Sequence, residues 1–256
     1  MSGTVEFRRQ TTIEKIEPLY GIPELHDGHT EVWLEYELGV TLVDGKVSKW
    51  TDISHGRELI PYATDGSTAT SDNYPSYSST NGIIFDGVDD VLNVRIESWQ
   101  DLGNVYIVFS QLSWTQTDVI YAFDGYYNGG YNYAVGEGLM QRGGIQPRFL
   151  LYNAIRGFSD YIETLPLNTY GLITSEWSNT SQSLQHNNNT PVTTAWDLPD
   201  YWAVGGIVLG GEHGGNSINF QRWCNVAIKA VICRNQVDNA TTKAAIKTYL
   251  TGKYLQ

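Results

Sequence analysis

The stretch Asn81–Leu92, NGIIFDGVDDVL, constrains the fold more than any other part of this chain. Its apolar run Ile83–Phe85 has the length and composition of a buried strand. Asp86 and Gly87 follow with turn chemistry, because glycine accepts positive φ and aspartate bonds nearby backbone amides. The apolar pair 91–92 then restarts a strand. The stretch therefore predicts strand, turn and strand, which is a unit of antiparallel β-structure.

The rest of the chain repeats this pattern of short apolar runs between turn residues. Segment 31–40 alternates apolar and acidic side chains, which predicts a half-buried strand whose glutamates face solvent. Further strand candidates follow at fairly regular spacing, at 47–50, 83–85, 105–111, 119–123, 148–153, 169–177, 183–186, 202–209 and 227–233. Many short strands joined by Gly, Asn and Pro turns predict an all-β sandwich of jelly-roll type. Sandwiches often reach 256 residues as one domain.

The two ends of the chain differ from this pattern. Residues 1–24 contain two prolines and predict an extended arm ahead of a single domain at 25–256. Residues 61–80 are rich in Ser, Thr, Asp and Tyr and predict a long surface loop. Near the C-terminus, Asp238 or Asn239 can cap a helix that ends before Gly252. The apolar stripe of that helix is Ala245, Ile246, Tyr249 and Leu250.

Two motifs together resemble the LamG-like domains of the concanavalin superfamily. They are WTDISHG at 50–56 and FDGVDDVL at 85–92. The C-terminal strand, the helix and the tail YLTGKY at 249–254 resemble the end of the same domains. The resemblance implies a concanavalin-like β-sandwich (jelly roll) with an N-terminal extended arm and one short C-terminal helix. Domains of this type occur in secreted bacterial proteins and in bacteriophage virion proteins.

The N-terminal arm and the absence of an apolar signal core favour the virion among these settings. We therefore expect a non-enzymatic virion structural protein, a surface decoration, fibre or adhesion module made in the host cytoplasm without a signal peptide. Residues 1–24 would anchor it to capsid or tail proteins, and a homo-oligomer is compatible with that role. The alternatives are a carbohydrate-binding, lectin-like module for host-surface glycans and, less favoured, a glycoside hydrolase.

The net charge limits the classes of partner, and the spacing of the two cysteines predicts their redox state. The formal net charge is −12, so phosphate backbones and anionic membranes are poor partners, and no apolar stretch is long enough to span a bilayer. On one strand, Cys224 and Cys233 would lie about 30 Å apart, at about 3.3 Å per residue. That is too far for a disulfide, so both are expected to be reduced, although a bend between them would weaken this inference.

Four aspartates in the two motifs are candidate metal ligands. Carboxylate oxygens are what calcium prefers, and it takes about six to eight oxygen ligands. The competing interpretation is that these side chains cap turns, which short aspartates beside glycine commonly do. The candidate calcium ligands are Asp52, Asp86, Asp89 and Asp90.

Two aromatic loops are candidate binding surfaces. One run, at 126–133, mixes tyrosines with Asn and Gly, and another, at 196–202, is flanked by tryptophans. Aromatic faces with nearby polar groups suit sugar binding, protein contacts, or packing on the end of the sandwich, and the residues leave these three open. The candidate ligand-binding residues are Tyr126, Tyr127, Tyr131, Tyr133, Trp196 and Trp202.

Catalytic patterns are weak. Glu35 and Glu37 share a predicted strand face, but no third acid completes the run expected of a glucanase of this superfamily. His26, His29 and His213 are too few and too scattered to form a zinc site, and are expected to be ordinary loop histidines. The chain is therefore expected to have no catalytic residues.

Overall fold

The computed structural model describes residues 10–13, 22–96, 103–114, 120–126, 137–141, 149–153, 157–160, 165–178, 180–195, 205–213 and 220–256. Their strands are β1 (Gln10–Ile13), β2 (Thr30–Glu35), β3 (Val40–Val43), β4 (Lys46–Thr51), β5 (Glu58–Pro61), β6 (Ser76–Ser78), β7 (Gly82–Asp86), β8 (Leu92–Arg95), β9 (Asn104–Gln111), β10 (Ile120–Tyr126), β11 (Glu137–Gln141), β12 (Phe149–Asn153), β13 (Gly157–Asp160), β14 (Gly171–Trp177), β15 (Ser181–His186), β16 (Val192–Ala195), β17 (Gly206–Leu209), β18 (Glu212–His213), β19 (Phe220–Gln221) and β20 (Asn225–Arg234). The helices are two short 3-10 turns, η1 (Pro23–Leu25) and η2 (Ser71–Asn73), and α1 (Ala240–Tyr254).

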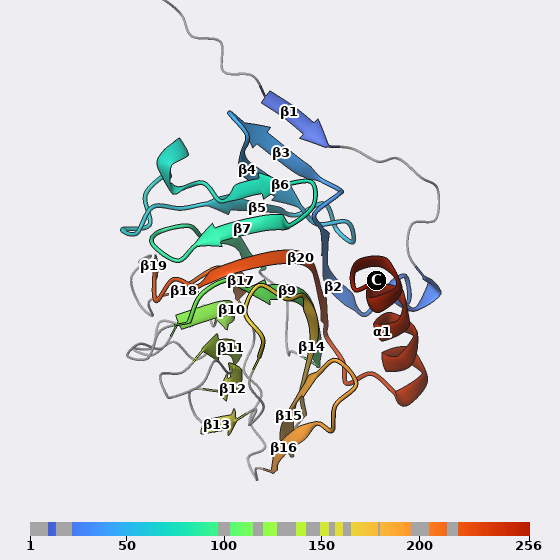
Figure 1. Cartoon of the computed structure of the whole chain (residues 1–256). Helices are drawn as coiled ribbons and strands as arrows, with labels where there is room; N and C mark the ends of the chain where they lie inside the picture. Colours follow the sequence, from blue (N-terminus) through green and yellow to red (C-terminus); the bar gives the residue numbers. More distant parts are fainter. Residues whose placement is uncertain are drawn as a thin grey trace, which may run out of the picture.

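The strands form a sandwich of two antiparallel layers (Figure 1). In the first layer, β20 pairs along its length with β9, and the series continues through β14, β15 and β16. On its other side, β20 pairs first with β7 and then with β2. The second layer runs β13, β12, β11, β10, β17, β8. Strand β5 joins the layers, because it pairs with β4 of the first and β8 of the second. The all-β sandwich predicted from the sequence is confirmed.

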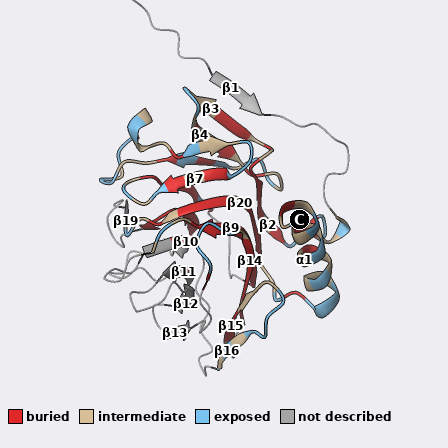
Figure 2. Ribbon diagram, in the orientation of Figure 1, coloured by how far each residue is buried: buried red, intermediate tan, exposed pale blue. Residues whose placement is uncertain are grey.

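The core follows the long central strands. All eight residues of β9 are buried, and so are eight of the ten residues of β20 (Figure 2). Cys224 and Cys233 are buried free thiols at the two ends of this region, which confirms the expected absence of a disulfide between them. Burial raises the pKa of the Cys233 thiol well above its usual range. Both cysteines are therefore part of the packing rather than reactive groups.

Helix α1 packs on the outer face of the first layer. The Asn239 side chain accepts a hydrogen bond from the amide of Thr242, which confirms the predicted helix start. Gly252 does not end the helix as expected, because the helix continues to Tyr254, whose ring is buried against the sheet. No helix among the residues described here is long and apolar enough to cross a membrane.

This helix overturns the expected exposure of segment 31–40. Strand β2 ends at Glu35, a turn follows, and β3 begins at Val40. The Glu35 side chain is fully buried, because α1 covers the face that the alternating pattern assigns to solvent. Residues 61–80 also differ from the predicted loop, since η2 and β6 lie within them.

The predicted N-terminal arm is described in part. Its residues Gln10–Ile13 form β1, which pairs antiparallel with β3 at the edge of the first layer. This segment is therefore hydrogen-bonded to the sandwich rather than free of it. The boundary at residue 24 and the partners and location assigned to the arm stay predictions.

Candidate functional site

A hollow of about 220 Å³ opens between the segment before β2 and the turn after β4. We call it the Trp33 hollow. Its volume lies somewhat below the range of about 300 to 1,000 Å³ that is usual for drug-sized ligands, so it suits a smaller ligand. Three apolar side chains, two imidazoles and two hydroxyls line it together with one glycine. The lining residues are Leu25, His26, Gly28, Thr30, Trp33, Ile53, Ser54 and His55.

One wall of the hollow is held by Asp52. Its Oδ1 accepts hydrogen bonds from the Trp33 amide at 2.7 Å, the Ser54 amide at 3.0 Å and the Ser54 hydroxyl at 2.7 Å. Its Oδ2 accepts from the His55 amide at 2.9 Å. The carboxylate is 2% exposed, so these bonds operate away from water and fix the turn to β2. Asp52 is thus a turn anchor, and its carboxylate is not part of the cluster that Asp86, Asp89 and Asp90 form.

The opposite wall is held by Arg234, at the end of β20. Its fully buried guanidinium donates to both oxygens of Asp27, at 2.8 and 2.6 Å, and to the carbonyl of Glu24 at 2.7 Å. It also donates to the Thr30 hydroxyl at 2.8 Å and to Asp238 just before α1. Burial raises the pKa of Asp27, but the hydrogen bonds and charge of Arg234 lower it by more, so the pKa lies below its usual range. Two buried ions therefore hold the two walls in place.

The buried indole of Trp33, which is 1% exposed, is part of the lining. His26 meets this ring edge to face, with ring centroids 5.5 Å apart. The indole Nε1 donates to Glu35 at 2.8 Å, which sets the orientation of the ring. At the rim, His55 Nδ1 lies 3.0 Å from the Ser54 hydroxyl. The lining thus combines apolar side chains with imidazole and hydroxyl groups, which suits a ligand with both C–H and O–H faces.

Glu35 stabilises this region rather than acting on a ligand. Its carboxylate accepts from Tyr249 at 2.5 Å and Tyr254 at 2.8 Å, and it pairs with Lys253. Burial raises the Glu35 pKa, while the hydrogen bonds from these tyrosines and Trp33 lower it; burial prevails. All these donors come from α1 or β2, so the carboxylate fastens the helix to the sheet. Glu37 lies in the turn after β2 and also pairs with Lys253, at 3.5 Å.

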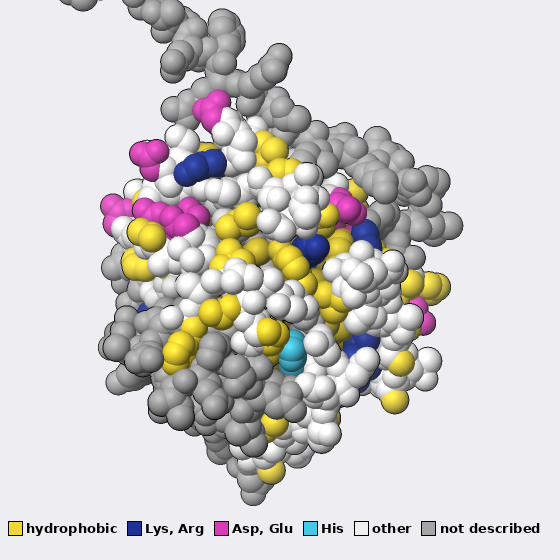
Figure 3. Space-filling view, viewed as in Figure 1, with side chains coloured by type: hydrophobic (Ala, Val, Ile, Leu, Met, Phe, Trp, Pro, Cys, Tyr) yellow, Lys and Arg dark blue, Asp and Glu magenta, His cyan; other side chains and the backbone are white. Residues whose placement is uncertain are grey.

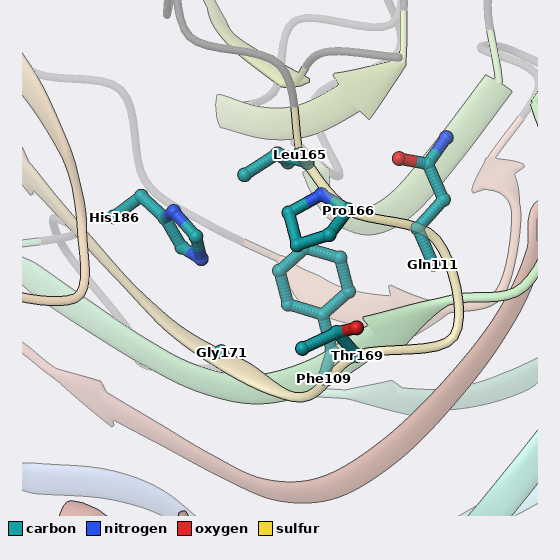
Figure 4. A pocket seen from close by; sticks show the side chains of 7 residues that line it. All are labelled: Phe109, Gln111, Leu165, Pro166, Thr169, Gly171 and His186. Atoms are coloured by element: carbon teal, nitrogen blue, oxygen red, sulfur yellow. The ribbon is translucent and has the colours of Figure 1, made fainter.

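A second, much smaller hollow of about 10 Å³ lies over β9 and β14 (Figure 4). Phe109 forms its base, with Pro166 beside the ring and His186 on the other side of the space. A Cβ at Gly171 would lie 2.3 Å from His186 Nε2, so any other residue at this position would have to displace the imidazole. Its volume is about that needed for one water molecule, so the Trp33 hollow is the better candidate for a ligand site.

The other predicted site residues divide into two groups. Asp86, Asp89 and Asp90 do come together, with one carboxylate oxygen of each within 4.8 Å of the others. The aromatic candidates cannot be placed in the same way, because Tyr127, Tyr131, Tyr133, Trp196 and Trp202 lie outside the described residues. Tyr126 ends β10, and its side chain also lies outside the description.

Sequence reasoning missed the Trp33 hollow because its two walls lie more than twenty residues apart in the chain. His26 was expected to be an ordinary loop histidine. A usable signal was present in the motif at 50–56, where Asp52 precedes Ser54 and His55 in an arrangement typical of a side-chain-bonded turn.

No protein-family model matches the chain, and no curated protein matches it. Solved structures do resemble it. A Trypanosoma rangeli sialidase in complex with sialic acid aligns with a TM-score of 0.59 and 11% identity over 88% of this chain. This chain spans only 33% of that sialidase. A GH54 α-L-arabinofuranosidase aligns with a TM-score of 0.54 at 10% identity, over 89% of this chain and 60% of the enzyme.

The third structure is a single domain. Domain 4 of AbnA, a GH43 extracellular arabinanase from Geobacillus stearothermophilus solved with arabinotriose, has a TM-score of 0.53 and 9% identity. The alignment covers 85% of this chain and 98% of that domain. At these identities the likeness shows the fold. The expectation of a non-enzymatic virion structural protein is wrong, because these three structures come from glycan-processing enzymes and none of them is a virion component.

Proposed function

We propose that this chain is a carbohydrate-binding domain that holds a glycan in the Trp33 hollow without cleaving it. The observation that carries the proposal is the hollow itself, whose lining combines apolar side chains with imidazole and hydroxyl groups between two fixed walls. A sugar presents C–H faces to rings and hydroxyls to polar groups, so its chemistry matches this lining. Fixed walls reduce the entropy lost on binding.

The structural likenesses support the class of ligand. The arabinanase domain that aligns over almost its whole length was solved with arabinotriose, and the sialidase with sialic acid. Neither ligand is carried over to this chain, but both proteins process or bind glycans. We also infer that the sandwich is of the concanavalin-like, LamG-like type, supported by the FDGVDDVL motif and the strand–helix ending.

Binding without cleavage is proposed from the state of the strand carboxylates. Glu35 is buried and hydrogen-bonded to Trp33, Tyr249 and Tyr254, so it is committed to packing. Hydrolysis of a glycosidic bond commonly needs two carboxyl groups that flank the bond. No acidic side chain is among the residues that line the described Trp33 hollow.

The test is a glycan array that includes arabinotriose and sialylated glycans, followed by titration calorimetry with the strongest hit. We expect binding that weakens about tenfold or more in His55→Ala, a loss of about 1.4 kcal/mol. His29→Ala is the matched control, since His29 is exposed, contacts Asn235 and does not line the hollow. An array without hits, or equal binding by wild type and His55→Ala, would contradict the proposal. Release of cleaved sugar from the bound glycan would contradict the absence of catalysis.

A further inference from the structure

The two walls of the Trp33 hollow are held by buried ions of opposite charge. On one wall, the Arg234 guanidinium donates to the Thr30 hydroxyl. On the other, the Asp52 carboxylate accepts from Ser54 and His55. A guanidinium can only donate hydrogen bonds, and a carboxylate can only accept them. Each ion therefore fixes the sense in which the hydroxyl beside it is used.

The Thr30 hydroxyl is left as a donor. Its Oγ1 accepts from Arg234 at 2.8 Å, so a lone pair rather than the proton is directed at the cation. Within the described part of the chain, no acceptor takes the Thr30 hydroxyl proton. Thr30 is 4% exposed and lines the hollow. A buried donor without an acceptor costs free energy, and a ligand oxygen in the hollow would supply the acceptor.

The Ser54 hydroxyl is used in the opposite sense. Its Oγ lies 2.7 Å from Asp52 Oδ1, which only accepts, so the serine proton is directed at the carboxylate. The Glu31 carbonyl, at 3.3 Å, is the weaker acceptor for the same proton. His55 Nδ1 lies 3.0 Å from the same Oγ, which has no second proton to donate. The imidazole therefore carries a proton on Nδ1 and donates it to Ser54.

This tautomer leaves His55 Nε2 as an acceptor. In a neutral imidazole one nitrogen carries the proton, and the other presents a lone pair. Asp52 Oδ2, which lies 3.9 Å from Nδ1, favours the proton on that side of the ring. The His55 side chain is 44% exposed, and none of the described residues donates to its Nε2. One wall of the hollow thus offers a donor and the other an acceptor.

We propose that the Trp33 hollow holds one neutral sugar unit, with the Thr30 hydroxyl donating to a sugar oxygen and His55 Nε2 accepting from a sugar hydroxyl. This specificity rests on the proposed glycan binding. A sugar hydroxyl both donates and accepts, so a single ring carries both groups that the walls require. A volume of about 220 Å³ corresponds to roughly seven water molecules at about 30 Å³ each, which suits one sugar unit rather than two.

The charges around the hollow favour a neutral sugar over an acidic one. No Lys or Arg is among the residues that line the described hollow. In its walls, the single guanidinium of Arg234 is outnumbered by three carboxylates, those of Asp27, Asp52 and Asp238. The chain has a formal net charge of −12, and acidic side chains also gather at the left edge of the face in Figure 3. A sugar carboxylate would therefore enter a region of negative charge.

The test uses the full chain on an array of neutral and acidic glycans. The neutral set ends in galactose, glucose or arabinose, and the acidic set ends in galacturonic, glucuronic or sialic acid. At pH 8 and about 0.15 M salt, imidazoles are neutral and distant charges are screened. We expect the best neutral glycan to bind about tenfold or more tightly than any acidic one. An acidic glycan that binds as tightly would overturn this inference and leave the proposed function standing, whereas an array without hits would overturn both.

Thr30→Val tests the donor, because it removes the hydroxyl and keeps the branched shape. Binding of the best neutral glycan should weaken about tenfold, the effect of about one hydrogen bond, while Thr30→Ser should stay within about twofold of the wild type. Thr251→Val is the matched control, since its hydroxyl donates to the Lys247 carbonyl on α1 and does not line the hollow. Circular dichroism verifies folding. Unchanged binding by folded Thr30→Val would overturn the donor role; should this variant not fold, the array on the wild type still decides between the two classes of sugar.

His55→Gln tests the acceptor. The glutamine amide keeps an acceptor oxygen on a side chain of similar reach, whereas alanine keeps none. His55→Gln should therefore bind the best neutral glycan more tightly than His55→Ala does, as calorimetric titration measures. An equal loss of affinity in both variants would overturn the acceptor role of Nε2.

Discussion

Two turns of the molecule place a buried aspartate in opposite circumstances. Asp52, after β4, is 2% exposed and accepts four hydrogen bonds with its two oxygens. Asp90, before β8, is 3% exposed, yet its Oδ2 accepts one hydrogen bond and its Oδ1 accepts none from the described residues. The two side chains are equally removed from water and differ in what surrounds them.

The difference lies in how the charge of each buried carboxylate is satisfied. Around Asp52, backbone amides and a hydroxyl point inward and satisfy the charge, so the carboxylate holds one wall of the Trp33 hollow. Around Asp90, the neighbours are Asp86 and Asp89, which repel it. Burial raises the Asp90 pKa to about 6, and the charge of Asp86 adds to this effect. Burial alone therefore does not identify an anchor, whereas the partners do.

The largest expected effect is that of Asp52→Ala. The substitution removes the acceptor of the Trp33, Ser54 and His55 amides. A buried donor that loses its hydrogen-bond acceptor costs about 1 to 3 kcal/mol of folding free energy. We expect unfolding free energy to fall by about 3 kcal/mol or more. Urea denaturation followed by tryptophan fluorescence measures this loss. A loss below about 1 kcal/mol would show that water replaces the carboxylate and that Asp52 is not an anchor.

Asp27→Asn extends the comparison to a carboxylate whose main partner is a cation, Arg234, rather than backbone amides. Arg234 keeps Asp238 and the Glu24 carbonyl, so it loses part of its pairing rather than all of it. We expect the unfolding free energy to fall by about 1 kcal/mol, less than for Asp52→Ala. Urea denaturation of both variants measures which loses more unfolding free energy. A larger loss in Asp27→Asn than in Asp52→Ala would contradict this prediction.

The stabilisation by the Asp27–Arg234 ion pair should also depend on pH. Its pKa is lowered in the folded protein, so its stabilisation is present above the unfolded pKa and is lost as pH falls through the folded pKa. The stability difference between wild type and Asp27→Asn should be constant from pH 7 to about 5 and shrink at pH values below about 3.9. Urea midpoints of both proteins across this range provide the measurement. A difference that is unchanged at pH 3 would contradict the lowered pKa.

The smallest effect on stability is expected for Asp90→Asn. An amide oxygen can still accept from the Asp86 amide, and the substitution removes one of three repelling charges. We expect a change within about 1 kcal/mol, toward greater stability at pH 7. Chemical denaturation beside Asp52→Ala tests the comparison directly. A loss as large as that of Asp52→Ala would show that Asp90 is an anchor of the same kind.

The β-architecture was predictable because its signals are local. Alternation and turn residues predicted β7, β9, β14 and β20 close to their observed bounds. Helix α1 begins where Asn239 predicted, since capping depends on a few neighbouring residues. Its end was misplaced because the buried contact of Tyr254 with Glu35, a residue 219 positions earlier, favours continuing the helix past Gly252.

The candidate sites were predictable in part. The acidic cluster at 86–90 was found because its members lie within one turn, where sequence neighbours are also spatial neighbours. Asp52 was wrongly grouped with them, since residue type alone does not show which amides a carboxylate will meet. The Trp33 hollow was missed because its lining joins residues 25–33 with residues 53–55 across the fold.

The amino-acid sequence by itself determined the strands, the turns and the start of the helix, because hydrophobic alternation, turn chemistry and capping act over a few residues. The tertiary structure alone decided which polar groups became buried and what they met there. Glu35 looked solvent-exposed until α1 covered it, and Asp52 and Asp90 looked alike until the sandwich surrounded one with amides and the other with carboxylates. Burial and partners arise from packing between distant segments, which no local pattern encodes.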